Sequence, residues 1–299
     1  SDIKLKYGGA TGLQINNGNL IANTPQGTIT EDAPYTYQKD GKKISSGFKL
    51  EGDVLSYTTG EYTGELVIDP SINWGTYYGG SNTEYAFRVA TDGSGNVYIT
   101  GYTFSTGGGT AIATTGSHQD TYAGGTADGF LAKFNSAGVR QWATYYGGSS
   151  DDAPYDVATD GSGNVYITGW AFSTSGIATS GSHQDTHGGS ADGFLAKFNS
   201  SGVRQWATYY GGTSADQCWG VATDGSGDVY ITGITATSSG TTIATTGSHQ
   251  DTYGGSSYDG FLAKFNSSGV RQWATYYGGS GIEYCQAVAT DGSGNVFIT

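Results

Sequence analysis

The sequence predicts an all-β protein built from β-propeller blades that follow a small β domain. Its composition is the first observation: only 13% of the 299 residues are charged, while glycine contributes 52. The apolar residues are mainly Val, Ile, Tyr, Phe and Trp, which favour strands. Long apolar runs at helical spacing are absent, which argues against helices. The third observation is an internal repeat, which decides the architecture.

Four tryptophans mark the repeat, at spacings of 68, 64 and 67 residues: Trp74, Trp142, Trp206 and Trp273. Each tryptophan is followed by a stretch ending in "VATDGSG", and the first three copies continue to "DGFLAKFNS". Self-similarity at a fixed period indicates an array of one supersecondary unit. We therefore divide the chain into an N-terminal β-rich domain and the repeats, with bounds 1–73, 74–141, 142–205, 206–272 and a partial 273–299.

Each repeat contains four predicted strands, around "RVATD", "NVYITG", "GFLAKFN" and "RQWATYYGG". Short glycine-bearing turns, "DGSGN" and "NSAGV", connect them as hairpins. In "GFLAKF", Phe130, Ala132 and Phe134 point to one side and Leu131 to the other, so both faces are apolar. Four antiparallel strands with two apolar faces are typical of a propeller blade.

Residues 1–73 contain alternating runs such as "GLQINNGNLIANT" and are interpreted as the C-terminal portion of a larger β domain. Propellers close with about four to eight blades, whereas three complete repeats and part of a fourth are present. We therefore expect about four consecutive blades of a larger, incomplete ring. We expect residues 1–73 not to complete the fourth sheet.

The units "DGSGNVYITG", "DGFLAKFNSAGVRQWATYYGG" and "GSHQDTYGG" resemble the SBBP-type β-propeller repeats of secreted bacterial proteins. The lead-in "GTITEDAPYTYQ…LVIDPSINWGTYYGG" looks like the end of the domain that often precedes such repeats. This resemblance implies export and display at the cell surface. It also implies an origin in Bacteroidota and type IX secretion, but no defined chemistry.

The net charge of −13 limits the classes of partner. No basic stripe is available to neutralise the phosphates of a nucleic acid or an anionic membrane surface. No stretch approaches 18 apolar residues, so no transmembrane segment is expected. The partners that fit are other surface proteins, glycans or copies of the chain itself.

The repeated Asp-x-Ser-x-Asn pattern has two interpretations. Its oxygen-bearing residues have the spacing of ligands in calcium loops, and the residues concerned are Asp92, Ser94, Asn96, Asp160, Asp224 and Asp228. The alternative is a hairpin turn, in which the aspartate accepts local N–H groups and glycine supplies a positive φ. No later acidic residue closes a calcium shell, so we favour the turn and expect no cofactor, with calcium as the alternative.

Two further patterns recur and are interpreted as structural, because a catalytic centre is usually unique. "SHQD" contains His118, His183 and His249, followed by Asp120, Asp185 and Asp251. "DGFLAK" contains Asp128, Asp192 and Asp259, expected to be satisfied at a strand entry, and Lys133, Lys197 and Lys264, expected to face an edge. Outside the pattern, His187 replaces a tyrosine, which we interpret as surface packing.

Candidate ligand-binding residues are aromatic residues that do not repeat: Trp170, Trp219 and Tyr102. They lie in or near the long, variable segments, which should share one face of the blades. Aromatic rings are suited to the apolar faces of sugars. The recurring Trp142, Trp206 and Trp273 are expected in the core between blades.

Cys218 and Cys285 occupy the same repeat position, at the start of the innermost strand of neighbouring blades. A disulfide requires Cα atoms within about 7 Å. Equivalent inner-strand positions are often farther apart, so we favour two free, buried thiols over the bridge.

No catalytic motif is found. We therefore expect an extracellular or cell-surface, non-enzymatic module for display, adhesion or assembly. The alternative is a glycan- or peptide-binding module that uses aromatic residues of the long-loop face. A weaker alternative is the non-catalytic part of a larger secreted enzyme.

Overall fold

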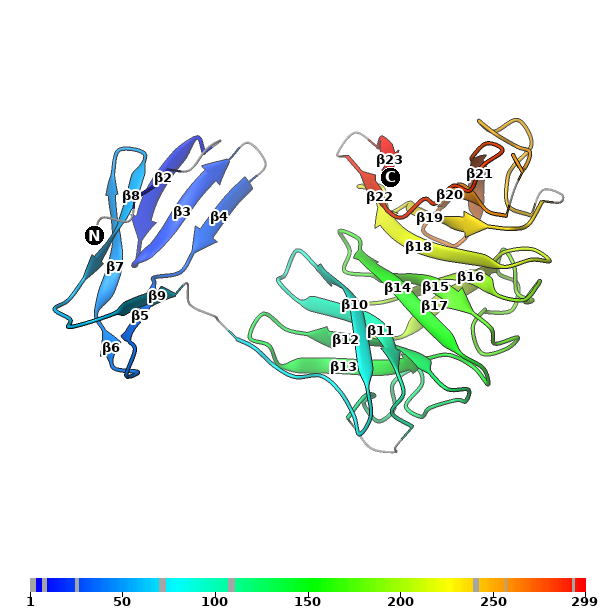
Figure 1. The fold of residues 1–299 in the computed structure, drawn as a ribbon. Helices are drawn as coiled ribbons and strands as arrows, with labels where there is room; N and C mark the ends of the chain where they lie inside the picture. Colours follow the sequence, from blue (N-terminus) through cyan, green and yellow to red (C-terminus); the bar gives the residue numbers. More distant parts are fainter. Residues whose placement is uncertain are drawn as a thin grey trace. The chain divides into compact units, whose positions relative to one another are not determined.

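The computed structural model describes residues 4–6, 10–24, 27–69, 74–106, 111–238, 242–255, 257–291 and 294–299. Regular structure in these residues consists of strands, without helices, as the sequence predicts. The chain divides into two compact units, Ser1–Gly75 and Thr76–Thr299, each of which is described by itself (Figure 1).

The first unit contains three small antiparallel sheets. Their strands, in sheet order, are β1 (Lys4–Lys6), β8 (Val54–Thr59) and β7 (Ser46–Glu51); β2 (Gly12–Asn16), β3 (Asn19–Thr24) and β4 (Gly27–Glu31); β6 (Lys43–Ile44), β5 (Tyr35–Gln38) and β9 (Leu66–Asp69). The β2–β3 hairpin turns at Asn17 and Gly18, whose φ angles of 51° and 87° are those of a type I′ turn. Leu20 and Leu55 are among the buried apolar residues of the first unit.

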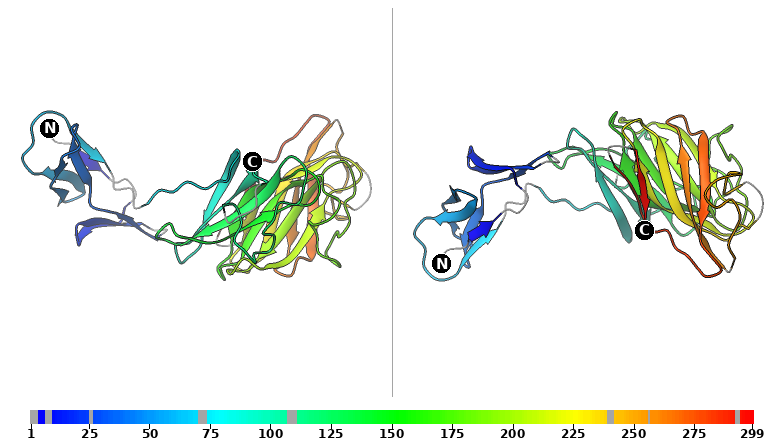
Figure 2. Two further views of the ribbon diagram at one scale, coloured as in Figure 1. Left: turned by 90° about the horizontal axis from the view of Figure 1, so that it is seen from below. Right: turned by 90° about the horizontal axis from the view of Figure 1, so that it is seen from above.

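The second unit contains three four-stranded antiparallel sheets and a two-stranded one (Figures 1 and 2). The first is β10 (Glu84–Thr91), β11 (Val97–Thr103), β12 (Asp128–Phe134) and β13 (Arg140–Tyr146). The second is β14 (Asp152–Thr159), β15 (Val165–Ala171), β16 (Asp192–Phe198) and β17 (Arg204–Tyr210). The third is β18 (Asp216–Thr223), β19 (Val229–Thr235), β20 (Asp259–Phe265) and β21 (Arg271–Tyr277). The last is β22 (Val288–Thr290) and β23 (Val296–Ile298).

Each four-stranded sheet is one blade, with the four strands that the sequence predicts. A repeat counted from its tryptophan begins with the last strand of one sheet, since Trp142 lies in β13 and Trp206 in β17. Within the described residues, the fourth sheet contains β22 and β23 alone, and no strand of the first unit pairs with it. The described strands therefore form consecutive blades without a closed ring.

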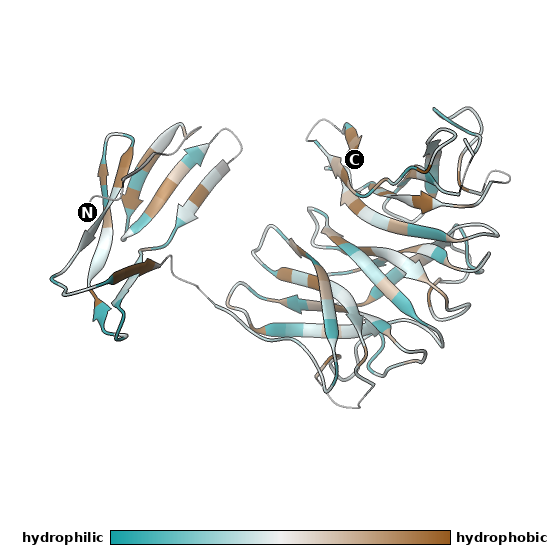
Figure 3. Cartoon of the chain, viewed as in Figure 1, coloured by the Kyte–Doolittle hydropathy of each residue, from teal (hydrophilic) through white to brown (hydrophobic). Residues whose placement is uncertain are grey.

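Burial of both faces explains why these segments form blades. All seven residues of β12, in the sequence "DGFLAKF", are buried, and Phe130, Leu131 and Ala132 have no exposed surface. Hydrophobic residues lie mainly on strands, and the connecting segments are more polar (Figure 3). The expectation of a sheet with two apolar faces is confirmed.

Identical residues connect successive blades. On the inner strands, the Thr159 hydroxyl donates to the Thr91 carbonyl (2.9 Å) and the Thr223 hydroxyl donates to the Thr159 carbonyl (2.9 Å). The Thr290 hydroxyl continues the series to the Thr223 carbonyl (2.8 Å). The threonine of "VATD" thus joins each blade to the one before it.

A second connection is made by the outer strands. Lys133 Nζ and Trp142 Nε1 both donate to the Ser200 carbonyl of the next blade, at 3.1 and 3.0 Å. Lys197 and Trp206 make the same pair of bonds to Ser267, both at 3.0 Å. The prediction that these lysines face an edge was wrong, because they bridge adjacent blades. The predicted inter-blade position of the tryptophans is confirmed for these two.

Lys264, in the third blade, is different because no following hairpin is present in the described residues. Its ammonium lies 2.7 Å from Asp228 Oδ2 and 4.0 Å from Asp224 Oδ2. Asp228 occupies the position of Asn96 and Asn164 in the preceding copies. Within the described residues, the Lys264 ammonium is therefore held by an ion pair inside its own blade.

The histidines of "SHQD" also serve packing. His118 packs against Tyr146 of its own blade and Phe198 of the next, with ring centroids 6.1 and 5.6 Å away. Burial, with a contribution from Arg204, lowers the pKa of His118 to about 4. His183 repeats these contacts with Tyr210 and Phe265. A neutral imidazole between blades supports the structural interpretation.

Candidate functional site

The site begins with an irregularity that recurs on the inner strands. Strand pairing shifts by one residue at three equivalent points, leaving Phe87, Tyr155 and Trp219 as the bulged residues of β10, β14 and β18. A β-bulge redirects the side chain of the extra residue. The residue opposite is a glycine each time; a Cβ on Gly169, for example, would overlap the Ala153 carbonyl oxygen. Because glycine has no side chain, the two strands can approach closely enough to form the bulge.

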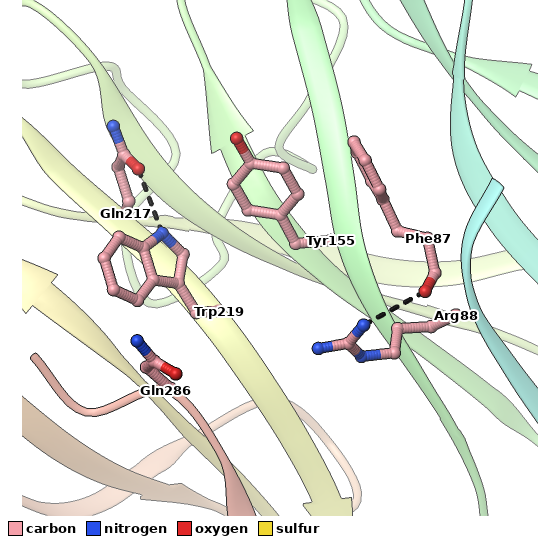
Figure 4. A pocket seen from close by; sticks show the side chains of 6 residues that line it. All are labelled: Phe87, Arg88, Tyr155, Gln217, Trp219 and Gln286. Atoms are coloured by element: carbon pink, nitrogen blue, oxygen red, sulfur yellow. Dashed lines mark hydrogen bonds between the residues drawn. The ribbon is translucent and has the colours of Figure 1, made fainter. Parts of the chain in front are cut away.

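The bulged side chains gather around one pocket of about 290 Å³ (Figure 4). The residues that line it are Phe87, Arg88, Tyr155, Gln217, Trp219 and Gln286. They come from β10, β14, β18 and the segment before β22, so every blade in the described chain contributes. In the fourth copy, Gln286 occupies the position of the bulged aromatics. The pocket is therefore built from the positions at which the copies differ.

Two polar groups in the pocket are held in place by their neighbours. Gln217 Oε1 accepts a hydrogen bond from the Trp219 indole N–H (3.0 Å), which leaves the amide nitrogen of Gln217 as a donor. Arg88 donates from Nη1 to the Phe87 carbonyl (3.1 Å), and its side chain is 57% exposed. The pocket thus combines aromatic walls with hydrogen-bond donors.

Asp156 is the acidic residue beside this pocket. Its Oδ1 lies 3.9 Å from Arg88 Nε, and its two oxygens accept the backbone N–H groups of Val157 and Val221, both at 2.9 Å. Burial is the largest influence and raises the pKa of Asp156, although both N–H groups and Arg88 oppose it. Asp156 joins two blades through its bond to Val221. Its ion pair with Arg88 is long, so the guanidinium can also bind a ligand.

Two of the predicted aromatic residues extend this surface along the second strands. Tyr102 contacts Tyr85 and Phe87, with centroids 5.1 and 5.3 Å away. Trp170 contacts Tyr155 at 6.4 Å and Phe172 at 5.0 Å. Both lie at the ends of strands from which the long segments leave, as expected. Trp219, the third predicted residue, stacks on Tyr284 at 5.6 Å and 20°. The structure brings all three predicted residues to one aromatic surface.

The "DGSGN" loops have the hydrogen bonds of a hairpin turn. Asp92 Oδ1 accepts the backbone N–H groups of Ser94 and Asn96, at 2.9 and 3.0 Å. Asp92 Oδ2 accepts from the Asn96 amide (2.8 Å) and the Tyr98 hydroxyl (3.0 Å). Asp160 repeats all four bonds. Burial raises the pKa of Asp92, but these bonds outweigh it and leave the pKa below its ordinary value.

The turn of the third copy is closed by Asp224, which accepts from the Ser226 backbone and hydroxyl, the Asp228 backbone and the Tyr230 hydroxyl. In these three loops, the aspartate carboxylate accepts hydrogen bonds from the protein itself. The same carboxylate would have to bind the ion if the loop were a calcium site. Among the described residues, no group of three His, Cys, Asp or Glu side chains could hold a metal ion.

The two cysteines are free and buried, so the disulfide left open by the sequence is not formed. The Cys218 sulfur lies against Gly193 and the Cys285 sulfur against Gly260, each at the third strand of the preceding blade. Burial raises the pKa of the Cys218 thiol to about 12 and also raises that of Cys285. Both thiols are packing groups in an uncharged form.

Family models match both units of the chain. A model described as "Beta-propeller repeat" (SBBP) matches residues 73–108, 141–176, 205–238 and 272–299. The chain is an SBBP-type β-propeller repeat protein. A model described as "Domain of unknown function (DUF7948)" matches residues 1–71. No curated protein matches the chain. The described residues contain no helix that is long and apolar enough to cross a membrane.

The sequence alone identified Trp219 but not most of the residues that line the pocket, including Phe87, Arg88, Tyr155 and Gln286. The available signal was the alignment of the copies. Phe87, Tyr155, Trp219 and Gln286 are different residues at one repeat position, two residues before the "VATDGSG" that all four copies share. The position of the bulge could not be read from the letters alone.

Proposed function

We propose that this protein is an extracellular, non-enzymatic propeller module that acts in adhesion by binding a glycan at the inner-strand pocket. One observation carries the proposal: residues at a repeat position that differs between the copies converge on one pocket. Ligand sites combine apolar and aromatic walls with a few oriented polar groups. Phe87, Tyr155 and Trp219 supply the walls, while Arg88 and Gln217 supply the donors.

A sugar suits this combination better than a peptide strand. Aromatic rings contact the apolar C–H face of a pyranose, while guanidinium and amide N–H groups reach its hydroxyl or carboxylate oxygens. An added strand would require a free sheet edge. The pocket instead offers aromatic rings and the side-chain donors of Arg88 and Gln217. The resemblance to repeats of secreted proteins implies export, and a ligand outside the cell is consistent with that expectation.

Glycan-array binding tests the proposal directly. We expect the intact chain to bind a subset of glycans, and Trp219→Ala or Tyr155→Ala to lower the association constant at least about tenfold. The matched control is Tyr62→Ala, which removes an aromatic ring that is 42% exposed in the first unit. Unchanged binding in both pocket variants, with all variants folded, would contradict the proposal.

A further inference from the structure

Pairs of carboxyl groups recur where one blade passes to the next. Each pair joins the aspartate that begins the third strand of a blade to the acid that begins the next blade. The pairs are Asp128 with Asp152, Asp192 with Asp216, and Asp259 with Glu283. All five aspartates have no exposed surface. Charged groups at this depth require compensation.

The second acid of the first pair is fully bonded. Asp152 Oδ2 accepts the Gly148 N–H (2.7 Å) and the Ser173 hydroxyl (2.7 Å), and Oδ1 accepts the Ser173 N–H (3.2 Å). Asp216 is bonded in the same way by Gly212 and by the hydroxyls of Thr235 and Thr237. Three donors to one carboxylate favour its ionised form, although burial is the larger influence and raises the pKa of both Asp152 and Asp216.

The first acid of each pair is only half bonded, which corrects the expectation of a satisfied aspartate. Asp128 Oδ2 accepts the Ala123 N–H (2.7 Å), whereas Oδ1 is buried without a partner. The Oδ1 atoms of Asp192 and Asp259 are likewise buried without a partner. The same atom is unpartnered at three equivalent places. A buried acceptor with no donor is costly when ionised.

The unpartnered oxygen faces the other acid of its pair across a glycine. A Cβ on Gly147 would lie 2.5 Å from Asp128 Oδ1 and 3.0 Å from Asp152 Oδ2. On Gly211 it would lie 2.8 Å from both Asp192 Oδ1 and Asp216 Oδ2. The space that a side chain would fill is therefore bordered by both carboxyl groups. This explains the need for glycine after "TYY".

We propose that each of these corners binds one proton, so that one carboxyl group of the pair is neutral and the other is ionised. Asp128, Asp192 and Asp259 take up the proton from solvent on Oδ1, the oxygen that otherwise has no partner. The neutral group then lies beside the ionised acid of the next blade. The proton removes one of the two negative charges and turns the unpartnered acceptor into an O–H donor.

A proton fits the corner better than a metal ion does. Calcium requires six to eight oxygen ligands, while each corner offers one oxygen without a partner. The remaining carboxylate oxygens at the first corner already accept N–H or O–H groups. Such donors turn their positive ends toward the site and would repel a cation.

The surrounding groups favour the same assignment. The pKa of Asp128 is raised to about 7, with burial as the largest cause, a further increase from nearby Asp152 and Asp151, and an opposing effect of the Ala123 and Gly124 N–H groups. The other titratable groups that face this first corner are tyrosines: Tyr122, Tyr145, Tyr146 and Tyr209. In the second corner, His187 replaces a tyrosine and partly lowers the raised pKa of Asp192.

The consequence is a stability that falls as pH rises. Since the folded pKa of Asp128 lies above its ordinary value of 3.8, the folded state holds the proton after the unfolded state has lost it. The unfavourable contribution therefore grows from about pH 4 to about pH 7 and is constant above that. An asparagine cannot ionise and reproduces the neutral acid with an N–H donor. Asp128→Asn should remove this dependence.

Thermal unfolding of the full chain from about pH 4 to about pH 9 tests the proposal. We expect the melting temperature of Asp128→Asn to match the wild type near pH 4 and to exceed it by a margin that grows until about pH 7. Asp152→Asn should instead unfold at lower temperature, because it removes the ionised partner. Asp120→Asn, at an exposed aspartate outside the corners that is bonded to the Gly116 N–H, is the matched control and should not reproduce the growing margin of Asp128→Asn.

A spectroscopic readout separates this proposal from a purely structural role. With ¹³C-labelled aspartate, the Asp128 carboxyl signal should titrate near pH 7 in the wild type, and that signal should vanish in Asp128→Asn. An Asp128 carboxyl that is ionised throughout this range would overturn the proposal. So would a rise in melting temperature on adding calcium that Asp128→Asn abolishes, because it would show a metal ion in place of the proton.

Discussion

The outer strands and the innermost strand of each blade contrast sharply in sequence. The fourth strand reads "RQWATYY" in β13, β17 and β21 without a change. The bulged position of the first strand reads Phe, Tyr and Trp, and the fourth copy has Gln there. The unchanged residues contact the neighbouring blade, whereas the changed ones face a pocket. Within one chain, identity therefore marks the framework and divergence marks the candidate binding surface.

The largest expected effect is the removal of a tryptophan that joins two blades. Trp142 packs on Gly202 and donates to the Ser200 carbonyl of the next blade. Trp142→Ala should lower the free energy of unfolding by about 4 kcal/mol. Trp219→Ala, at a tryptophan that lines the pocket, should change it by less than about 1 kcal/mol. Urea denaturation of both variants measures the difference, and equal losses would contradict the framework interpretation.

Closing the bulge should have the next largest effect. Gly169 faces the Ala153 carbonyl oxygen so closely that a Cβ would overlap it. Gly169→Ala should therefore cost about 3 kcal/mol by overpacking and displace Tyr155 from the pocket. Gly161 has open space around its Cβ position, and Gly161→Ala is the matched control. If the two variants unfold at the same denaturant concentration, the bulge does not depend on this glycine.

The turn aspartates should contribute less, and in a pH-dependent way. Asp160 accepts two backbone N–H groups, the Asn164 amide and the Tyr166 hydroxyl. Burial raises its pKa, but these bonds outweigh it and lower the pKa below 3.8. Asp160→Ala should cost about 2 kcal/mol at neutral pH. Because the native pKa is lowered, the difference from wild type should shrink as the pH falls below about 4.

If the turn held calcium instead, chelation would mimic the Asp160 variant. We expect EDTA to leave the melting temperature of the wild type unchanged, since the carboxylate is satisfied by protein donors. A bound ion would stabilise the fold by mass action. A large fall in melting temperature with EDTA, absent in Asp160→Ala, would therefore contradict the turn interpretation.

The smallest effect is expected where the third copy departs from the others. Asp228 forms an ion pair with Lys264 at 2.7 Å, and both side chains are between one fifth and one quarter exposed. Asp228→Asn restores the residue of the other copies and should change the free energy of unfolding by less than about 1 kcal/mol. Measurement at low and high salt should show the wild type to be the more salt-sensitive protein.

The blades could be predicted from the sequence because the strands and turns of each repeat are determined by local patterns within that repeat. The pocket was harder to predict. Its variable segments were visible, but the bulge that selects Tyr155 over its neighbours depends on pairing with β15. The shared carboxyl pairs were out of reach, since Asp128 and Asp152 belong to different blades and meet only across Gly147. Local patterns predict turns and strands, whereas contacts between blades require coordinates.

The contrast between framework and pocket is tested most directly by measuring stability and glycan binding in the same two variants. Trp219→Ala should lower the association constant at least about tenfold and keep the free energy of unfolding within about 1 kcal/mol of the wild type. Trp142→Ala should lose about 4 kcal/mol of stability and, at a temperature where it is folded, keep the wild-type affinity. The reverse pattern, in which Trp142→Ala abolishes binding while Trp219→Ala leaves it unchanged, would contradict the account.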